Sequence, residues 1–114
     1  MRKDDEVRLR HMLDAVREAI SFSMGKSRSA LDGDRMLVLS LVKEIEIIGE
    51  AASKVSKETQ AAYPEIPWPE LIGIRNRLIH AYFDVNLDIV WQTVVEDLPV
   101  LLSKLEEVFP DRSV

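Results

Sequence analysis

The sequence contains no cysteine among its 114 residues, which excludes disulfide bonds, zinc–thiolate centres and catalysis by a thiol. It also lacks any apolar run close to the roughly 18 residues that a membrane-spanning helix needs. Met1 is followed by five charged residues, where a secretory signal would need an apolar stretch. These absences predict a cytoplasmic protein that no membrane span anchors.

The chain has no excess of positive charge, because 15 Lys and Arg are set against 20 Asp and Glu, for a formal net charge of −5. Non-specific binding of nucleic acid depends on many phosphate contacts, so the net charge argues against a protein that coats DNA or RNA. Any contact with RNA must come from a local basic site. Apolar residues make up 46% of the chain, the balance of a globular protein, and we expect one domain over residues 1–114.

Helical periodicity dominates the sequence. Apolar side chains recur at three- and four-residue spacing over residues 4–24, 35–56 and 87–108, which predicts three long helices. No strand-like alternation or internal repeat interrupts this pattern. We therefore predict an all-α fold, an antiparallel bundle of four to five helices, with a kink at Pro99 in the last of them.

The middle of the chain predicts shorter elements. Residues 57–62 favour a short turn of helix, and three prolines within residues 63–69 stop it. Proline is tolerated in the first turn of a helix, where its missing N–H is no loss. We expect a further helix from Pro69 to about Phe83.

The helix predicted over residues 35–56 is more apolar than one partner would cover. Besides its core stripe it carries a second apolar ridge, formed by Met36, Leu39, Ile47 and Ala51. A homodimer would bury this ridge, and we expect one. Gly49 borders the core stripe, where glycine costs about 1 kcal/mol relative to alanine, so we expect another backbone to approach closely there.

Arg75 falls in the middle of the apolar arc of the helix predicted from Pro69 onward. A guanidinium cannot lose its charge, so among apolar neighbours it must be paired or face a cleft. The structural alternative is an arginine that reaches solvent or pairs with a core carboxylate such as Glu44 or Glu50.

Asn76 and His80 are four residues apart and would share one face of that helix, where the amide can orient the imidazole. The alternative is an exposed pair, adjacent by chance. Arg75 would lie about 140° around the axis from His80, so a composite site formed by two copies of the helix would bring these groups together more easily. Arg77 points in a third direction, toward solvent or a substrate phosphate.

The segment Arg75-Asn-Arg-Leu-Ile-His80-Ala-Tyr82 resembles the signature of the HEPN superfamily of small helical ribonucleases, and its trailing His-x-Tyr is similar to that of the HepT toxins. Other blocks that resemble the family are Ile48-Gly-Glu-Ala51, Pro67-Trp68, Phe83-Asp-Val-Asn86 and Val90-Trp91. The resemblance covers nearly the whole chain. Ala81 stands where many relatives have glycine, a departure that leaves the motif residues intact.

This resemblance implies the toxin of a toxin–antitoxin pair, an endoribonuclease that needs neither metal nor cofactor. A ribose 2′-hydroxyl would attack the adjacent phosphorus while His80 moves protons as general acid or base. Arg75 would stabilise charge on the phosphoryl oxygens, and Asn76 would orient without reacting. A homodimer would supply two imidazoles, one for each proton transfer.

The resemblance also implies a partner, an antitoxin nucleotidyltransferase of the MNT type that adds AMP to the tyrosine of His-x-Tyr. Tyr82 matches that position. An anionic AMP beside Arg75 would block the site and cancel its positive charge. Taken without the family, Tyr82 is an amphipathic residue at the edge of the core.

Two other functions stay open. One is a non-catalytic helical module that binds nucleotide or a partner and accompanies a nucleotidyltransferase. The other is a structural dimerisation bundle, which explains the second apolar ridge but not a buried Arg75. The presence of both Arg75 and His80 favours the enzyme. His11 is expected to be exposed, and nothing at ligand spacing joins it to form a metal site.

Overall fold

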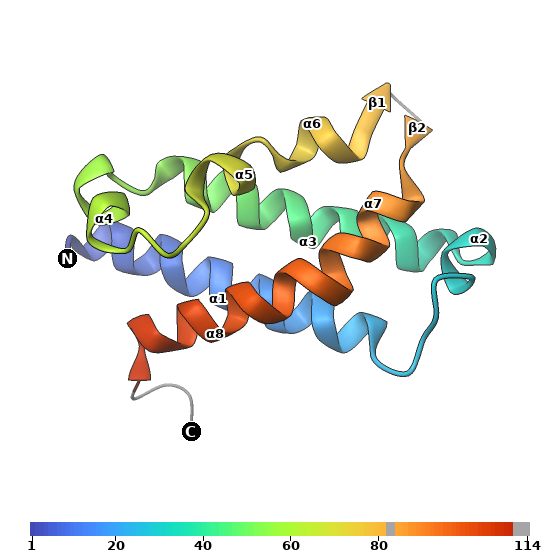
Figure 1. Cartoon of the computed structure of the whole chain (residues 1–114), viewed down its shortest axis with the longest axis horizontal. Coiled ribbons are helices and arrows are strands. Elements are labelled where there is room, and N and C mark those ends of the chain that lie inside the picture. The colour runs from blue at the N-terminus through green and yellow to red at the C-terminus, as the bar shows by residue number, and fades with distance from the viewer. Residues whose placement is uncertain (82–83, 111–114) are drawn as a thin grey trace.

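The computed structural model describes residues 1–81 and 84–110, and for His80 and Ala81 it describes the backbone alone. Two long helices, α1 (Lys3–Ser23) and α3 (Arg35–Lys54), lie side by side (Figure 1). A third long helical segment packs across α1 and consists of α7 (Leu87–Gln92), a π-helical turn η1 (Thr93–Asp97) and α8 (Leu98–Val108). The predicted all-α fold and its three long helices are confirmed.

Short elements join the long ones: α2 (Ala30–Gly33), α4 (Lys57–Ala62), α5 (Trp68–Ile72) and α6 (Ile74–Leu78). The turn of helix predicted at residues 57–62 is confirmed by α4. After it, the indole N–H of Trp68 donates to the carbonyl oxygens of Gln60 and Tyr63, both at 3.1 Å, which fixes the proline-rich connector against α4. Within the described part of the chain, no helix is long and apolar enough to cross a membrane.

The core lies where the three long helical segments meet. Its largest fully buried side chains are apolar and come from every long segment and from α6: Leu9, Met12, Val16, Val38, Leu41, Ile45, Ile48, Leu78, Val90, Val94, Leu98 and Leu105. A kink was predicted at Pro99; what the structure shows there is a π-helical turn, η1, just before the proline. Proline has no N–H to bond one turn back and its ring crowds that carbonyl, so the backbone widens there.

The helix predicted from Pro69 to Phe83 is wrong. The chain forms α5, turns at Gly73, forms α6 and then passes into a short strand, β1 (Ile79–Ala81), which pairs antiparallel with β2 (Asp84–Val85). The carbonyl oxygen of Leu78 accepts from the backbone N–H of Asn86 at 2.7 Å, so it bonds into the chain that follows the strands. That pairing across the two strands replaces the next turn of helix.

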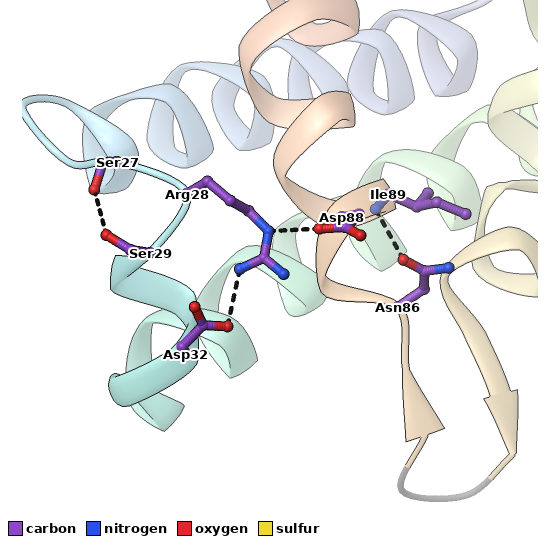
Figure 2. A network of polar contacts seen from close by, with 7 residues as sticks. All are labelled: Ser27, Arg28, Ser29, Asp32, Asn86, Asp88 and Ile89. Atoms are coloured by element: carbon purple, nitrogen blue, oxygen red, sulfur yellow. Dashed lines mark hydrogen bonds and ion pairs between the residues drawn. The ribbon is translucent and has the colours of Figure 1, made fainter.

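The start of α7, just after β2, is tied to the loop before α2 (Figure 2). Arg28 donates from Nε to Asp88 at 2.8 Å and from a terminal nitrogen to Asp32 at 3.1 Å. Asn86 caps α7 by accepting from the backbone N–H of Ile89 at 3.1 Å. Because Asn86 also bonds Leu78, these contacts fix where the chain leaves the two strands.

Gly49 lies where α3 meets α5 and α6. A Cβ at this position would be 2.7 Å from the carbonyl oxygen of Leu71 and 3.3 Å from Cγ2 of Ile74. The expected close approach of another backbone is confirmed. This contact lets the segment that carries Arg75 pack directly on α3.

Gly49→Ala should therefore lower the free energy of unfolding by about 1–2 kcal/mol, because overpacking typically costs about 1–3 kcal/mol and the helix propensity of alanine returns up to about 1. Urea denaturation measures the change. Gly33→Ala is the matched control, since no atom of the described residues would lie within 4 Å of a Cβ at that position. Equal stability of the two variants would contradict the packing of Leu71 on α3.

Candidate active site

Arg75 lies on α6 with 64% of its side-chain surface exposed, and its Nε donates to Oε2 of Glu46 on α3 at 2.6 Å. The prediction that Arg75 sits in the apolar arc is wrong, and so is the pairing with Glu44 or Glu50. Because the helix is interrupted at Gly73 and ends at Leu78, the wheel drawn for one long helix does not apply. The alternative prediction, an arginine that reaches solvent, matches the exposed position of Arg75.

The two carboxylates first considered as partners of Arg75 have other neighbours. Glu50 pairs with Lys54 at 3.2 Å, one turn along α3. Glu44 is buried against α1, where burial and the nearby Glu18 carboxyl raise its pKa to about 7. The carboxylate that holds Arg75 is thus the half-buried Glu46, between these two in sequence.

Asn76 and Arg77 follow Arg75 on α6, and both are exposed. The predicted stacking of Asn76 and His80 on one helix face is wrong, because α6 ends at Leu78 and His80 belongs to β1. The predicted angle of about 140° between Arg75 and His80 is wrong for the same reason, because it assumed that one helix carries both residues. The His80 side chain and the whole of Tyr82 lie outside what the structure describes.

A cleft of about 500 Å³ lies beside Arg75. Its lining residues come from α1, α3, α5 and α6. In Figure 1, α3 lies between α1 on one side and α5 and α6 on the other. The residues that line it are Arg8, His11, Lys43, Glu46, Ile47, Gly49, Glu50, Ala51, Ser53, Lys54, Ile72, Ile74 and Arg75. His11 is exposed as predicted, but it is part of this cleft.

The cleft carries a local excess of positive charge. Four cationic side chains and two carboxylates line it, whereas the whole chain has a net charge of −5. Glu46 and Glu50 are paired with Arg75 and Lys54. Arg8 and Lys43 make no ion pair within residues 1–81 and 84–110. This is the kind of local basic site that binding of RNA by an acidic protein requires.

Sequence reasoning missed Arg8 and Lys43. They come from two helices, so their proximity depends on how α1 packs against α3. Lys43, Ile47, Glu50 and Lys54 do share one face of α3 at helical spacing, which is a signal that the sequence contains. Only the packing shows that Arg8 and Arg75 border that face.

Arg77 is directed to a different part of the surface from Arg75, as predicted. It lines a second cavity of about 340 Å³, between α5 and α6 on one side and η1 and α8 on the other. Lys104 also lines that cavity and donates to the carbonyl oxygen of Glu65 at 2.7 Å. Arg75 and Arg77 therefore lie on separate surfaces of the protein.

The exposed groups of α6 suit recognition of an anion. The Nε of Arg75 is engaged by Glu46, and its terminal nitrogens donate to no other described residue, which leaves the outer edge of the guanidinium for phosphate oxygens. The amide of Asn76 is exposed beside it. Among residues 1–81 and 84–110, no three His, Cys, Asp or Glu side chains gather as a ligand set for a metal ion.

These features define a class, small all-α proteins with a basic cleft that an exposed arginine lines. Comparison with known proteins gives the family. The family described as "Ribonuclease HepT-like" matches residues 12–108. The chain belongs to this HepT-like ribonuclease family, which confirms the resemblance stated from the motif, and it is a ribonuclease.

Individual relatives also carry ribonuclease names. The chain is 40% identical over 75 residues to "Probable ribonuclease HepT" of Thermococcus cleftensis, covering 66% of this chain and 68% of that protein. It is 35% identical over 100 residues to "Putative RNase TTE0752" of Caldanaerobacter subterraneus, covering 88% and 89% of the two chains. "Putative RNase MJ1380" of Methanocaldococcus jannaschii is 29% identical over 107 residues, covering 94% and 98%. No solved structure gives a significant match.

Proposed function

We propose that this ribonuclease is a metal-independent endoribonuclease, the cytoplasmic toxin of a toxin–antitoxin pair, that cleaves RNA by attack of a 2′-hydroxyl. The observation that carries the proposal is the exposed Arg75 at the basic cleft of a HepT-like chain. The terminal nitrogens of its guanidinium match the oxygens of a phosphodiester, and the carboxylate of Glu46 holds the other edge in place.

His80 is the proposed proton carrier. The 2′-oxygen bonds to phosphorus as a base removes its proton, the bond from phosphorus to the 5′-oxygen breaks, and an acid protonates the leaving 5′-oxygen. The products are a cyclic phosphate and a free 5′-hydroxyl. Arg75 stabilises the charge that builds up on the phosphoryl oxygens, and Asn76 orients the reacting groups. Two imidazoles, one from each copy in a dimer, would serve the two proton transfers.

A homodimer that forms a composite site is supported by the apolar ridge of α3. Met36 is 79% exposed and Leu39 is 50% exposed, whereas Ala51 at the other end of the ridge is buried within the chain. Ile47 is half-buried and also lines the cleft. A second copy that covered Met36 and Leu39 would therefore stand next to the cleft, where it could complete the site.

The antitoxin partner and the modification of Tyr82 rest on the family resemblance. We propose an MNT-type nucleotidyltransferase that adds AMP to Tyr82, placing negative charge where Arg75 needs a substrate phosphate. Arg77, exposed on the other side of α6, is proposed as an additional contact to RNA. The alternative is a non-catalytic module that binds nucleotide or a partner through the same surface.

The test is incubation of purified protein with total RNA in excess EDTA, with wild type beside His80→Ala and with analysis of the product ends. We expect cyclic-phosphate ends from the wild type and a rate about 10²–10⁴-fold lower from His80→Ala, the usual contribution of general acid–base catalysis. Product ends other than cyclic phosphate would contradict attack by the 2′-hydroxyl. No cleavage by a folded dimer whose Tyr82 is unmodified would favour the binding module.

A further inference from the structure

We propose that Arg8 and His11 of α1, together with Lys43 of α3, form a phosphate-binding subsite for RNA, separate from the proposed reaction centre at Arg75. The identity of the ligand as RNA rests on the proposed function, whereas the anion site rests on the geometry of the cleft. The subsite would hold a phosphodiester away from the bond that is cut.

The first observation is that Arg8 and Lys43 make no ion pair with any residue that the structure describes. Three other arginines are paired with carboxylates. Arg10 and Arg17 each make one ion pair and Arg28 makes two, at 2.6–3.1 Å. The Nε of Arg8, in contrast, is buried and donates to no acceptor in the part of the chain that the structure describes. Buried donors in folded proteins are nearly always bonded, so an unpaired one calls for an acceptor from outside.

The second observation is the convergence of donors from two helices. Arg8 and His11 are three residues apart on α1 and share one of its faces, and Lys43 joins them from α3. Guanidinium, imidazole and ammonium groups all offer N–H donors, which is the set that binds an anionic oxygen. No carboxylate pairs with Arg8 or Lys43 among the described residues, so the charge of these two side chains is available.

The third observation concerns the kind of polyanion. The cleft also has apolar lining, from the half-buried Ile47 of α3 and from Ile72 at the end of α5, which is 41% exposed. Positive groups and apolar surface in one cleft suit a single-stranded nucleic acid, whose phosphates alternate with the apolar faces of its bases. An RNA strand held at Arg75 would cross α3 to reach Arg8, and this favours RNA over an acidic peptide.

The test is binding of a labelled single-stranded RNA whose 2′-hydroxyls are all methylated, which blocks the proposed cleavage, measured by fluorescence anisotropy as a function of salt. The variant is Lys43→Ala, because Lys43 is exposed and pairs with no carboxylate in the described part of the chain, so its loss should leave the fold intact. Each phosphate contact to a single strand contributes about 0.7 to the slope of log affinity against log salt. We expect the slope to fall by about 0.7 and the affinity to fall about fivefold at about 0.1 M salt.

Lys26→Ala is the matched control, an exposed lysine in the loop after α1 that does not line the cleft. Arg8→Gln is a second variant, expected to lower the slope in the same way. Slopes equal to that of Lys26→Ala in both variants would overturn the subsite. Equal, Lys43-dependent binding of polyglutamate would also overturn it, in favour of an acidic protein partner.

The binding test can be interpreted separately from the proposed enzyme activity, because the methylated RNA reports binding alone. If wild-type protein cleaves no RNA in EDTA yet binds the methylated strand through Lys43, the enzyme mechanism fails and the subsite stands. If wild-type protein cleaves RNA while Lys43→Ala and Lys26→Ala bind alike, the subsite fails and the mechanism stands.

Discussion

Arg75→Ala should lower the rate of RNA cleavage by about 10²–10³-fold, the usual cost of removing one donor that stabilises charge in a transition state. The same change should cost at most about 1 kcal/mol in the free energy of unfolding, because the ion pair between Arg75 and Glu46 is largely exposed. The cleavage rate on a defined RNA in EDTA and a urea denaturation curve, measured on the same preparation, check the two parts.

Arg75→Lys separates charge from shape. The ammonium keeps the positive charge but lacks the flat edge that bonds two phosphoryl oxygens, so we expect only part of the activity to return. Arg35→Ala is the matched control, an exposed arginine at the start of α3 that is not part of the cleft. A large loss of stability in Arg75→Ala, or full activity, would mean that Arg75 is structural.

The long helices could be predicted from the sequence because their signals are local. An apolar stripe repeats at three- and four-residue spacing in residues 4–24 and 35–56, and no distant contact is needed to recognise it. Gly49 was informative for a similar reason, since a glycine that lowers helix propensity in a helix interior usually has a packing cause. The carbonyl of Leu71, found 2.7 Å from the position of its absent Cβ, is that cause.

The end of α6, the helix that carries Arg75, could not be predicted from the sequence, because a hydrogen bond to a later part of the chain determines where it ends. Residues 74–83 fit a helical wheel well, but the Leu78 carbonyl bonds Asn86, eight residues further on. The pairing of Ile79 with Val85 then takes the place of the next helical turn. Helix propensity is a weak preference, and tertiary contacts override it here.

The candidate site likewise combines residues that could be found in the sequence with residues that could not. The motif residues from Arg75 to His80 could be found in the sequence, since their order alone carries the resemblance. Their surroundings could not: Glu46 was not among the partners considered for Arg75, and Arg8 and Lys43 lie 32 to 67 residues before it in sequence. Only the packing of α1 and α6 against α3 brings these groups to one cleft.

The buried Asp5 near the start of α1 connects that helix to α4. Its carboxylate accepts from the backbone N–H of Ser56 at 2.9 Å, from the Ser56 hydroxyl at 2.6 Å and from the Thr59 hydroxyl at 2.6 Å. The Ser56 hydroxyl in turn caps α4 by accepting from the N–H of Thr59. Asp5 thus orients the cap of another helix, and these bonds, that of the Ser56 hydroxyl first, lower its pKa to about 2.

A carboxyl whose pKa is lowered from 3.8 to about 2 on folding stabilises the protein above pH 3.8, and it loses that contribution as the pH falls toward 2. The shift corresponds to about 2 kcal/mol. Glu44 acts in the opposite direction and in another range: its pKa of about 7 means that its contribution is lost as the pH rises from 4.5 to about 7. Measurements between pH 2 and 4 therefore isolate Asp5 from Glu44.

Asp5→Asn should lower the free energy of unfolding by about 2 kcal/mol at pH 5, because an amide keeps the shape but not the charge that the three donors favour. The difference from wild type should shrink toward zero as the pH approaches 2, where wild-type Asp5 also becomes protonated. Urea denaturation across this range measures it, with Asp4→Asn, an exposed neighbour, as the control. Because other carboxylates titrate in both proteins, the informative quantity is the difference between wild type and variant. A difference independent of pH would show that Asp5 contributes shape alone, whereas one that disappears on acidification would establish that a charged carboxylate holds α1 to α4.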